Sequence, residues 1–495
     1  MECATPKATA PAEMQKFKRV LEQPENPFAS LVPNKTIAII PSFTLESNVT
    51  LFNVPLSYST RGKLSPKGDN VMVICHALSG SPDVGDWWGP LLEGPGRALD
   101  MKKFFIICMN SLGSPYGSAS PVTWKDGDPT RGLYGPEFPL TTIRDDVRFH
   151  KILLDELGVK QVAAVIGGSM GGMLVLEWAY FGKDYVRCIV PIATSSCHSA
   201  WGISWGEAQR QSIYADPKYN DGYYSFADAP VAGLSAARMS ALLTYRSRHS
   251  FDARFGRKNQ DTTNKPIITI SDKLPSSSLK DVHLTIHNDG DLSKRHPNTN
   301  SPSEKISNED EDECTKPNGP HSCNSIDLTH NTNLKSENQE SISKFFSAQS
   351  YLRYKGSQFV KRFDSNCYIS ITRKLDTHDL ARSRTSSMSE ALALIEQPTL
   401  VLGVESDGLF TFEEQMELAC GIPNSRLEKI VSLEGHDAFL LQYEQVNAHI
   451  FKFLKEIIPD IMISRDENDV DRTKMSSVTS EKLSLETVVD DITAW

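Results

Sequence analysis

The chain has 495 residues, of which 39% are hydrophobic and 23% are charged, with a formal net charge of -10. This composition indicates a globular protein with a sizeable core, and its acidic balance argues against general binding to nucleic acid or to an anionic membrane. The nine cysteines form no CxxC pair or metal-ligand spacing. Because no signal or membrane-spanning segment is recognisable either, we expect reduced thiols, no metal and a cytoplasmic location.

The first part of the chain alternates short apolar runs with helical patterns. Residues 1–35 are rich in Pro, Lys and Glu, which predicts a flexible leader. Four apolar runs that follow have the length of buried strands, and they are 71–75, 104–109, 162–168 and 188–194. Two helical stretches, 143–158 and 173–182, separate the later runs. Buried strands separated by helices predict an α/β fold, with a mostly parallel sheet and helices on both faces.

After residue 196 helical stretches replace the strands, and residues 258–344 are dominated by polar residue types that are typical of disorder. The α/β pattern then returns, with two strands and a closing amphipathic helix at 398–404, 427–433 and 443–457. We therefore predict a core made of 36–196 and 396–460, a helical lid at 197–395 interrupted by the polar insert at 258–344, and an acidic mobile tail at 461–495.

A candidate nucleophile follows one of the predicted strands. The segment 167–171, Gly-Gly-Ser-Met-Gly, fits the pattern G-x-S-x-G and lies between a strand and a helix. This context is the nucleophile elbow of the α/β-hydrolase fold, in which a strained turn exposes the serine hydroxyl. We predict that fold, with an inserted helical lid, and Ser169 as the nucleophile.

A serine nucleophile needs a general base, and the base needs an acid that orients it. In this fold the chain order is serine, acid, histidine, with the last two in loops after late strands. Asp407 and His436 occupy those places. His378 is a rival base, but it precedes the strand that carries the acid, and Glu405 is a rival acid closer to the strand body.

The oxyanion of an acyl-transfer intermediate needs two backbone N–H donors. The first is expected from Met170, directly after the nucleophile, and the second from Leu78, in the loop after the strand 71–75. His76 opens the same loop and is expected to shape it.

Several segments together resemble homoserine O-acetyltransferase, in particular its fungal form, over residues 40–258 and 345–457. They are CHALSGS (75–81), DWWGPLL (86–92), NSLGSPYGSASP (110–121), YGPEFPLTTIRDDVR (134–148), IGGSMGGMLVLEWA (166–179), AARMSALLTYRSR (236–248), SYLRY (350–354), TRKLDTHDLA (372–381), ESDGLF (405–410) and GHDAFLL (435–441). By this resemblance the nucleophile, acid and base fall on Ser169, Asp407 and His436.

The resemblance also implies how the substrate is held. Arg238 would bind the carboxylate of an amino acid and Asp437 its ammonium group, since a guanidinium pairs with a carboxylate and a carboxylate accepts from an ammonium. Three neighbouring arginines are expected to be ordinary helix charges: Arg246, Arg248 and Arg254.

The implied reaction transfers acetyl from acetyl-CoA, as co-substrate and with no other cofactor, to L-homoserine through an acetyl-serine intermediate, for methionine synthesis. The resemblance further implies a homodimer formed through the lid helices. From the residues alone several alternatives stay open: serine or deacetylcephalosporin C as the acceptor, succinyl-CoA as the donor, a carboxylesterase, and a non-catalytic scaffold.

Overall fold

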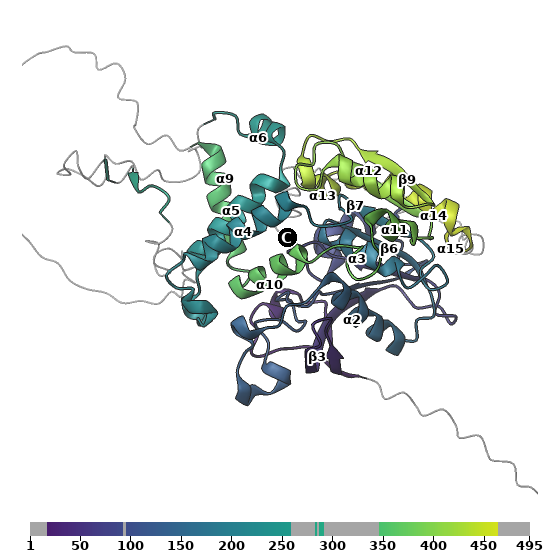
Figure 1. Ribbon diagram of the computed structural model, residues 1–495, viewed down its shortest axis with the longest axis horizontal. Coiled ribbons are helices and arrows are strands. Elements are labelled where there is room, and N and C mark those ends of the chain that lie inside the picture. Colours follow the sequence, from purple (N-terminus) through teal and green to yellow (C-terminus); the bar gives the residue numbers. More distant parts are fainter. Residues whose placement is uncertain (1–16, 93–95, 259–282, 285–286, 292–345, 464–495) are drawn as a thin grey trace, which may run out of the picture. The chain divides into compact units, whose positions relative to one another are not determined.

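The structure is a computed structural model that describes residues 17–92, 96–258, 283–284, 287–291 and 346–463 (Figure 1). The chain divides into two units, residues 259–347 and all the rest, and the larger unit contains every described strand. The predicted insert lies almost wholly outside the described residues, as do residues 1–16 of the predicted leader and most of the predicted tail.

The centre of the larger unit is a sheet of nine described strands in the order β1-β2-β3-β5-β4-β6-β7-β8-β9. The first three pair antiparallel, as do β3 and β5, and all later neighbours are parallel. This confirms the mostly parallel sheet. The strands are β1 (Lys18–Val20), β2 (Thr36–Thr44), β3 (Thr50–Arg61), β4 (Val71–Cys75), β5 (Phe105–Met109), β6 (Val162–Gly168), β7 (Ile189–Ile192), β8 (Thr399–Val404) and β9 (Ser425–Ile430).

Several of the sequence-based boundaries are wrong. The helix expected at 173–182 spans Met170–Ala179, and the mobile tail expected from 461 begins too early, because α15 (Pro459–Met462) buries Met462. The flexible leader at 1–35 is too long, because residues 18–20 form β1 and pair with β2. The strand expected at 427–433 lies earlier, at Ser425–Ile430. It ends there because its partner β8 ends at Val404, which pairs with Ile430, so the following residues have no neighbour strand.

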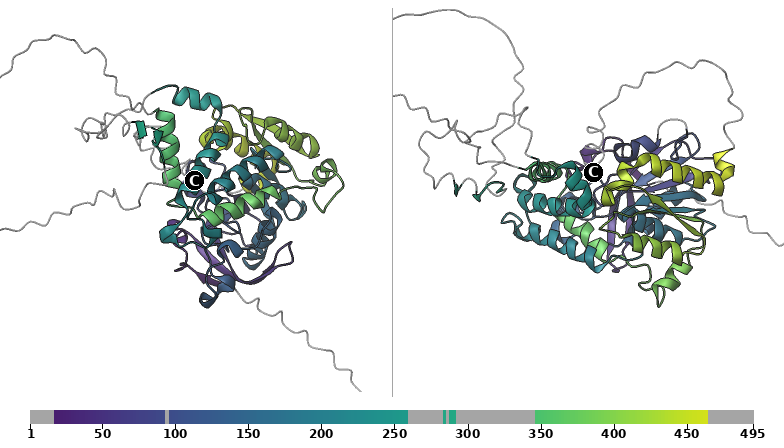
Figure 2. Two further views of the ribbon diagram at one scale, coloured as in Figure 1. Left: turned by 60° about the vertical axis from the view of Figure 1, so that its left-hand side comes forward. Right: turned by 90° about the horizontal axis from the view of Figure 1, so that it is seen from above.

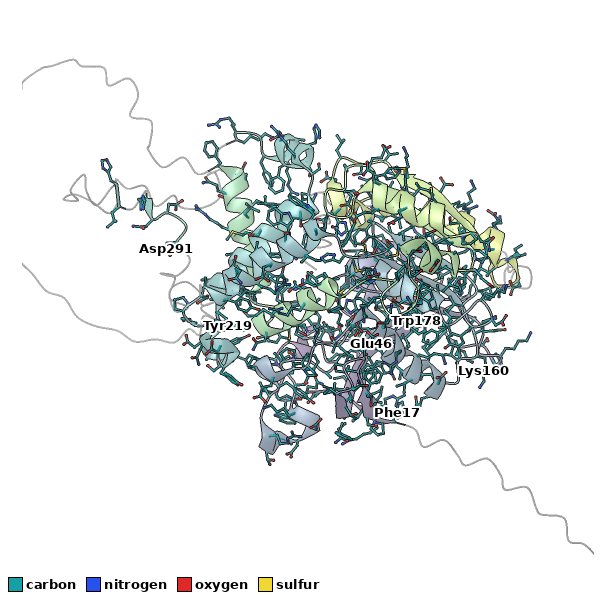
Figure 3. All side chains as sticks on the ribbon, in the orientation of Figure 1. Phe17, Glu46, Lys160, Trp178, Tyr219 and Asp291 are labelled. Atoms are coloured by element: carbon teal, nitrogen blue, oxygen red, sulfur yellow. The ribbon has the colours of Figure 1, made fainter. Side chains whose placement is uncertain are left out.

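The two faces of the sheet bury separate apolar clusters. In β4, Val71 and Val73 belong to one cluster and Met72 and Ile74 to the other, as the period of two of a strand requires. The first cluster includes side chains of α2 (Ile143–Glu156), α3 (Met170–Ala179) and α12 (Phe412–Gly421); the second includes those of α1 (Val84–Leu92) and α14 (Tyr443–Ile457). Helices therefore cover both faces (Figure 2). Trp178 of α3, labelled in Figure 3, is fully buried.

Between β7 and β8 the chain forms the helices of the predicted lid, which group together in Figure 1. They are α4 (Ala200–Tyr214), α5 (Val231–Tyr245), α6 (Arg248–Arg254), α9 (Ser347–Phe359) and α10 (Ser365–Asp376). A buried ion pair ties α10 to the core: Lys374 binds Asp146 of α2, and both side chains are inaccessible. The short α11 (Met388–Ala393) contacts α12 of the core. Among the described residues, no helix is both long and apolar enough to cross a membrane.

Candidate active site

Ser169 occupies a sharp turn between β6 and α3. Its backbone has φ 60° and ψ -126°, a strained conformation for a residue with a side chain. The neighbouring glycines make room for the turn: a Cβ on Gly171 would lie 2.1 Å from the carbonyl oxygen of Cys75, and one on Gly167 would lie 2.8 Å from the same oxygen. The local geometry is that of a nucleophile elbow.

His436 and Asp407 form a buried pair at the ends of neighbouring strands. Nδ1 of His436 lies 2.7 Å from Oδ2 of Asp407, so the nitrogen donates and leaves Nε2 available. The other carboxylate oxygen accepts from the backbone N–H groups of Leu409 and Phe410, at 2.8 and 3.0 Å. These bonds fix the carboxylate, which in turn fixes the imidazole ring.

The electrostatics around His436 favour its protonated form. Burial lowers the pKa of His436, but the charge of Asp407 and the hydrogen bond to it, with a contribution from the charge of Asp437, outweigh burial and raise the pKa above its ordinary value. A base with this environment can accept a proton from a hydroxyl and hold the charge that results.

One small cavity, of about 50 Å³, brings most of the predicted residues together. It is lined by Ala77, Leu78, Ser79, Ser169, Arg238, Tyr245, His436, Asp437, Phe439 and Leu440. The predicted residues Met170, the first residue of α3, and Asp407, the hydrogen-bond partner of His436, do not line this cavity. The wall is mainly apolar and includes a few polar side chains, among them those of Ser169 and His436.

The loop that carries Leu78 is held by His76. Its Nδ1 lies 2.8 Å from the carbonyl of Ala77, and its Nε2 accepts from the backbone N–H of Ser111 at 3.0 Å. Burial lowers the pKa of His76 to about 4, so the ring is neutral at neutral pH and can accept that bond. His76 therefore shapes the loop, as its place in the sequence predicted.

The rival base and the rival acid lie elsewhere. His378 is buried, with Nε2 3.1 Å from the carbonyl oxygen of Ser195, and burial lowers its pKa to about 4. Glu405 forms an exposed ion pair with Lys429. Neither lines the cavity that contains Ser169.

Arg238 is a buried cation with unused hydrogen-bonding capacity. It is 4% exposed, and its guanidinium carbon lies 4.6 Å from the ring centre of Phe359 and 5.4 Å from that of Tyr245. Its Nη1 has no hydrogen-bond partner among the described residues. A buried donor of this kind is costly unless a ligand satisfies it, so the cavity suits an anionic group.

Arg246 departs from the role that the sequence predicted for it. It was expected to be an ordinary helix charge, but it is 6% exposed and its guanidinium pairs with Glu434 and, at 3.0 Å, with Asp437. By contrast, Arg248 is 92% exposed in its side chain and pairs weakly with Asp252. Tyr245 was also missed, although it lies in the segment AARMSALLTYRSR that carried the resemblance.

Among the described residues, no group of three or more metal-ligating side chains is placed to hold a metal ion. The cysteines there are unpaired, and they are Cys75, Cys108, Cys188, Cys197, Cys367 and Cys420.

Comparison with known proteins gives both a fold and close relatives. The family model described as alpha/beta hydrolase fold matches residues 70–443. A homoserine O-acetyltransferase of Emericella nidulans is 59% identical over 487 residues, which span 97% of this chain and 98% of that relative. An enzyme of the same name from Schizosaccharomyces pombe is 53% identical over 490 residues, which span 96% of this chain and 96% of that relative. Another from Saccharomyces cerevisiae is 52% identical over 431 residues, which span 87% of this chain and 88% of that relative.

Solved structures share the fold at low sequence identity. A homoserine O-acetyltransferase from Bacillus anthracis superposes with a TM-score of 0.63 at 19% identity, covering 89% of this chain and 98% of that one. The esterase E22 superposes with a TM-score of 0.62 at 22% identity, covering 85% of this chain and 99% of that one. Because a transferase and an esterase superpose equally well, these likenesses concern the fold alone.

Proposed function

The chain belongs to the homoserine O-acetyltransferase family of the α/β-hydrolase fold, and we propose that it transfers acetyl from acetyl-CoA to the side-chain hydroxyl of L-homoserine. The relatives that are 52–59% identical over most of the chain carry this proposal. It is supported by the cavity in which Ser169, His436, Arg238 and Asp437 converge. The product, O-acetylhomoserine, would serve methionine synthesis.

In the first half-reaction, Oγ of Ser169 attacks the thioester carbonyl of acetyl-CoA while Nε2 of His436 takes the hydroxyl proton. The backbone N–H groups of Met170 and Leu78 donate to the oxyanion that forms. The C–S bond then breaks, the proton passes from His436 to the CoA sulfur, and Ser169 is left as an acetyl ester. Asp407 keeps the imidazole in the tautomer that this proton transfer needs.

In the second half-reaction, homoserine enters after CoA has left. Nε2 of His436 takes the proton of the side-chain hydroxyl, whose oxygen attacks the ester carbonyl on Ser169 through the same oxyanion site. The Ser169 oxygen then leaves and regains its proton from His436, which restores the free enzyme. Release of one product before the second substrate binds predicts ping-pong kinetics.

Recognition of an amino acid explains why the acceptor is an alcohol rather than water. Arg238 would pair with the carboxylate of homoserine and Asp437 with its ammonium group. These contacts would hold the hydroxyl near the ester, which raises its effective concentration far above that of an unpositioned acceptor. An esterase with the same fold does not need such a pair of opposite charges, because its acceptor is water.

The function is tested by an acceptor panel. Release of the CoA thiol from acetyl-CoA is measured with L-homoserine, L-serine, or no acceptor. We expect release to depend strongly on homoserine. Equal release without an acceptor would mean a hydrolase, and a preference for serine would keep the donor and the covalent route but replace the acceptor.

The charges proposed to bind homoserine can be tested one at a time. Arg238→Met and Asp437→Asn should each lower kcat/KM for homoserine by about 10²-fold or more, because each would leave a buried charge of the substrate unpaired. In ping-pong kinetics kcat/KM for acetyl-CoA reports only the first half-reaction, so it should change little. An equal loss in both constants would contradict this assignment, and melting curves would check that the variants fold.

We also propose that the protein is a cytoplasmic homodimer. The unpaired cysteines are compatible with a reducing compartment. Lid helices carry large hydrophobic side chains that are exposed in the single chain, which is typical of an interaction surface: Trp201 and Ile203 on α4, Val231 and Leu243 on α5, and Tyr354 on α9. Light scattering should give twice the mass of one chain, and a monomer at micromolar concentration would contradict the dimer.

A further inference from the structure

A partly buried ionic contact joins the end of helix α5 to the loop that carries His436, residues 433–437, which we name the base loop. Arg246 follows the last residue of α5. Its Nη1 donates to Oε2 of Glu434, and its Nε lies 3.0 Å from Oδ2 of Asp437 as an ion pair. Glu434 precedes His436 in the chain and Asp437 follows it, so one guanidinium contacts residues on both sides of the base.

The backbones at this contact are packed too closely to leave room for a side chain at Gly435. Gly435 has φ +77°, and a Cβ there would lie 2.5 Å from the backbone nitrogen of Ser247 and 2.9 Å from the carbonyl carbon of Arg246. Oγ of Ser247 donates to the carbonyl of Leu433, and Oγ of Ser250 donates to Glu434 at 2.5 Å. The base loop is therefore bound to this segment by several contacts besides the ion pairs.

The charges at the contact do not cancel. One guanidinium faces two carboxylates, Glu434 and Asp437, so one negative charge remains uncompensated within this group. Only Asp437 of the two lines the cavity with Ser169. The ion pair constrains its Oδ2, and no hydrogen bond to its Oδ1 is found among the described residues, which leaves an acceptor for an incoming cation.

Helix α5 carries Arg238 and ends directly before Arg246. Arg238 lies seven positions before Tyr245, the last residue of α5, about 10 Å along the helix axis, and it lines the cavity. Because a helix is stiff over this length, fixing its end to the base loop also fixes Arg238 relative to Asp437. The spacing between a positive and a negative group decides whether both ends of an amino-acid zwitterion can be bound together.

We propose that Arg246 is a positioning residue for the acceptor: it holds Asp437 at the distance from Arg238 that matches the ammonium and carboxylate of an amino acid. The inference rests on the proposed function and extends it. Arg246 does not line the cavity, so it acts through Asp437 and not by contact with homoserine. It thereby favours an amino-acid alcohol over water as the acceptor of the acetyl group.

The test separates the two half-reactions. In Arg246→Met we expect kcat/KM for homoserine to fall by about 10- to 100-fold, the cost of a small misplacement of a binding group. We expect kcat/KM for acetyl-CoA, and the slow hydrolysis of acetyl-CoA without an acceptor, to stay within about threefold of wild type. Arg248→Met is the matched control, since that arginine is exposed, and it should behave as wild type.

A double variant tests whether Arg246 acts through Asp437. If it does, Arg246→Met should add little further loss in a chain that already carries Asp437→Asn, whereas independent effects would multiply. Glu434→Gln, a milder change at the same contact, should reproduce part of the loss and keeps the test valid if Arg246→Met fails to fold.

Two outcomes overturn the inference alone. Equal losses in both kcat/KM values would mean that Arg246 supports His436 or the fold generally, and unchanged values would mean that it supports nothing in the reaction. A wild-type enzyme that forms acetyl-enzyme but does not pass acetyl to homoserine would overturn the proposed function, and the inference with it.

Discussion

Replacing Ser169 with alanine is expected to lower homoserine-dependent CoA release by about 10⁴-fold or more, because the whole covalent route is lost. The remaining groups cannot substitute for the nucleophile. Binding of acetyl-CoA and homoserine should persist, since the substitution removes one oxygen from a side chain that is already almost buried. The measurement is the rate of thiol release with both substrates present.

Ser204→Ala is a suitable control for this variant. Ser204 lies on the exposed side of α4, and its hydroxyl donates to the carbonyl of Ala200 within the same helix. It should retain wild-type activity. Substantial transfer by the Ser169 variant would contradict the covalent mechanism and would favour direct attack of homoserine on the thioester.

The second large effect is expected for Asp407→Asn, which should lower kcat by about 10⁴-fold while leaving the packing nearly intact. The amide would present a donor to Nδ1 of His436, so the ring would adopt the wrong tautomer. Glu405→Gln provides the control, because Glu405 is exposed and pairs with the exposed Lys429. Comparable losses in the two variants would contradict the assignment of Asp407 as the orienting acid.

The same variant should change the pH dependence of the remaining activity. The base must be neutral to accept a proton, so activity rises as pH increases through the pKa of His436. Asp407 raises that pKa against the opposing effect of burial. Without its charge, burial dominates and the pKa falls, so the residual activity should reach its plateau at lower pH than in wild type. A shift of the acidic limb to higher pH would contradict this account.

Much of the fold was predictable because the buried strands of a parallel sheet, and the helices between them, have recognisable local sequence patterns. The apolar run 71–75 became β4 without a change of boundary, and the motif at 167–171 placed Ser169 between a strand and a helix. The chain order of the α/β-hydrolase fold then pointed to Asp407 and His436, which the structure brings into hydrogen-bond contact. Their catalytic roles stay predictions that the variants above test.

The features that the sequence did not predict depend on distant partners. Strand β1 has three residues and forms because it pairs with β2, which is distant in the chain. The burial of Arg246 depends on Glu434, which is 188 positions away in the chain. An arginine in a helical pattern is ordinarily solvated, so neither charge nor periodicity distinguished Arg246 from Arg248.

The acetyl-serine intermediate is the central claim, and mass spectrometry of the protein after mixing with acetyl-CoA alone tests it most directly. The account predicts that the chain gains one acetyl group, located on the peptide that contains Ser169, and loses it when homoserine is added. CoA release that requires both substrates at once, with no acetylated protein, would contradict the account, as would an acetyl group on any other residue.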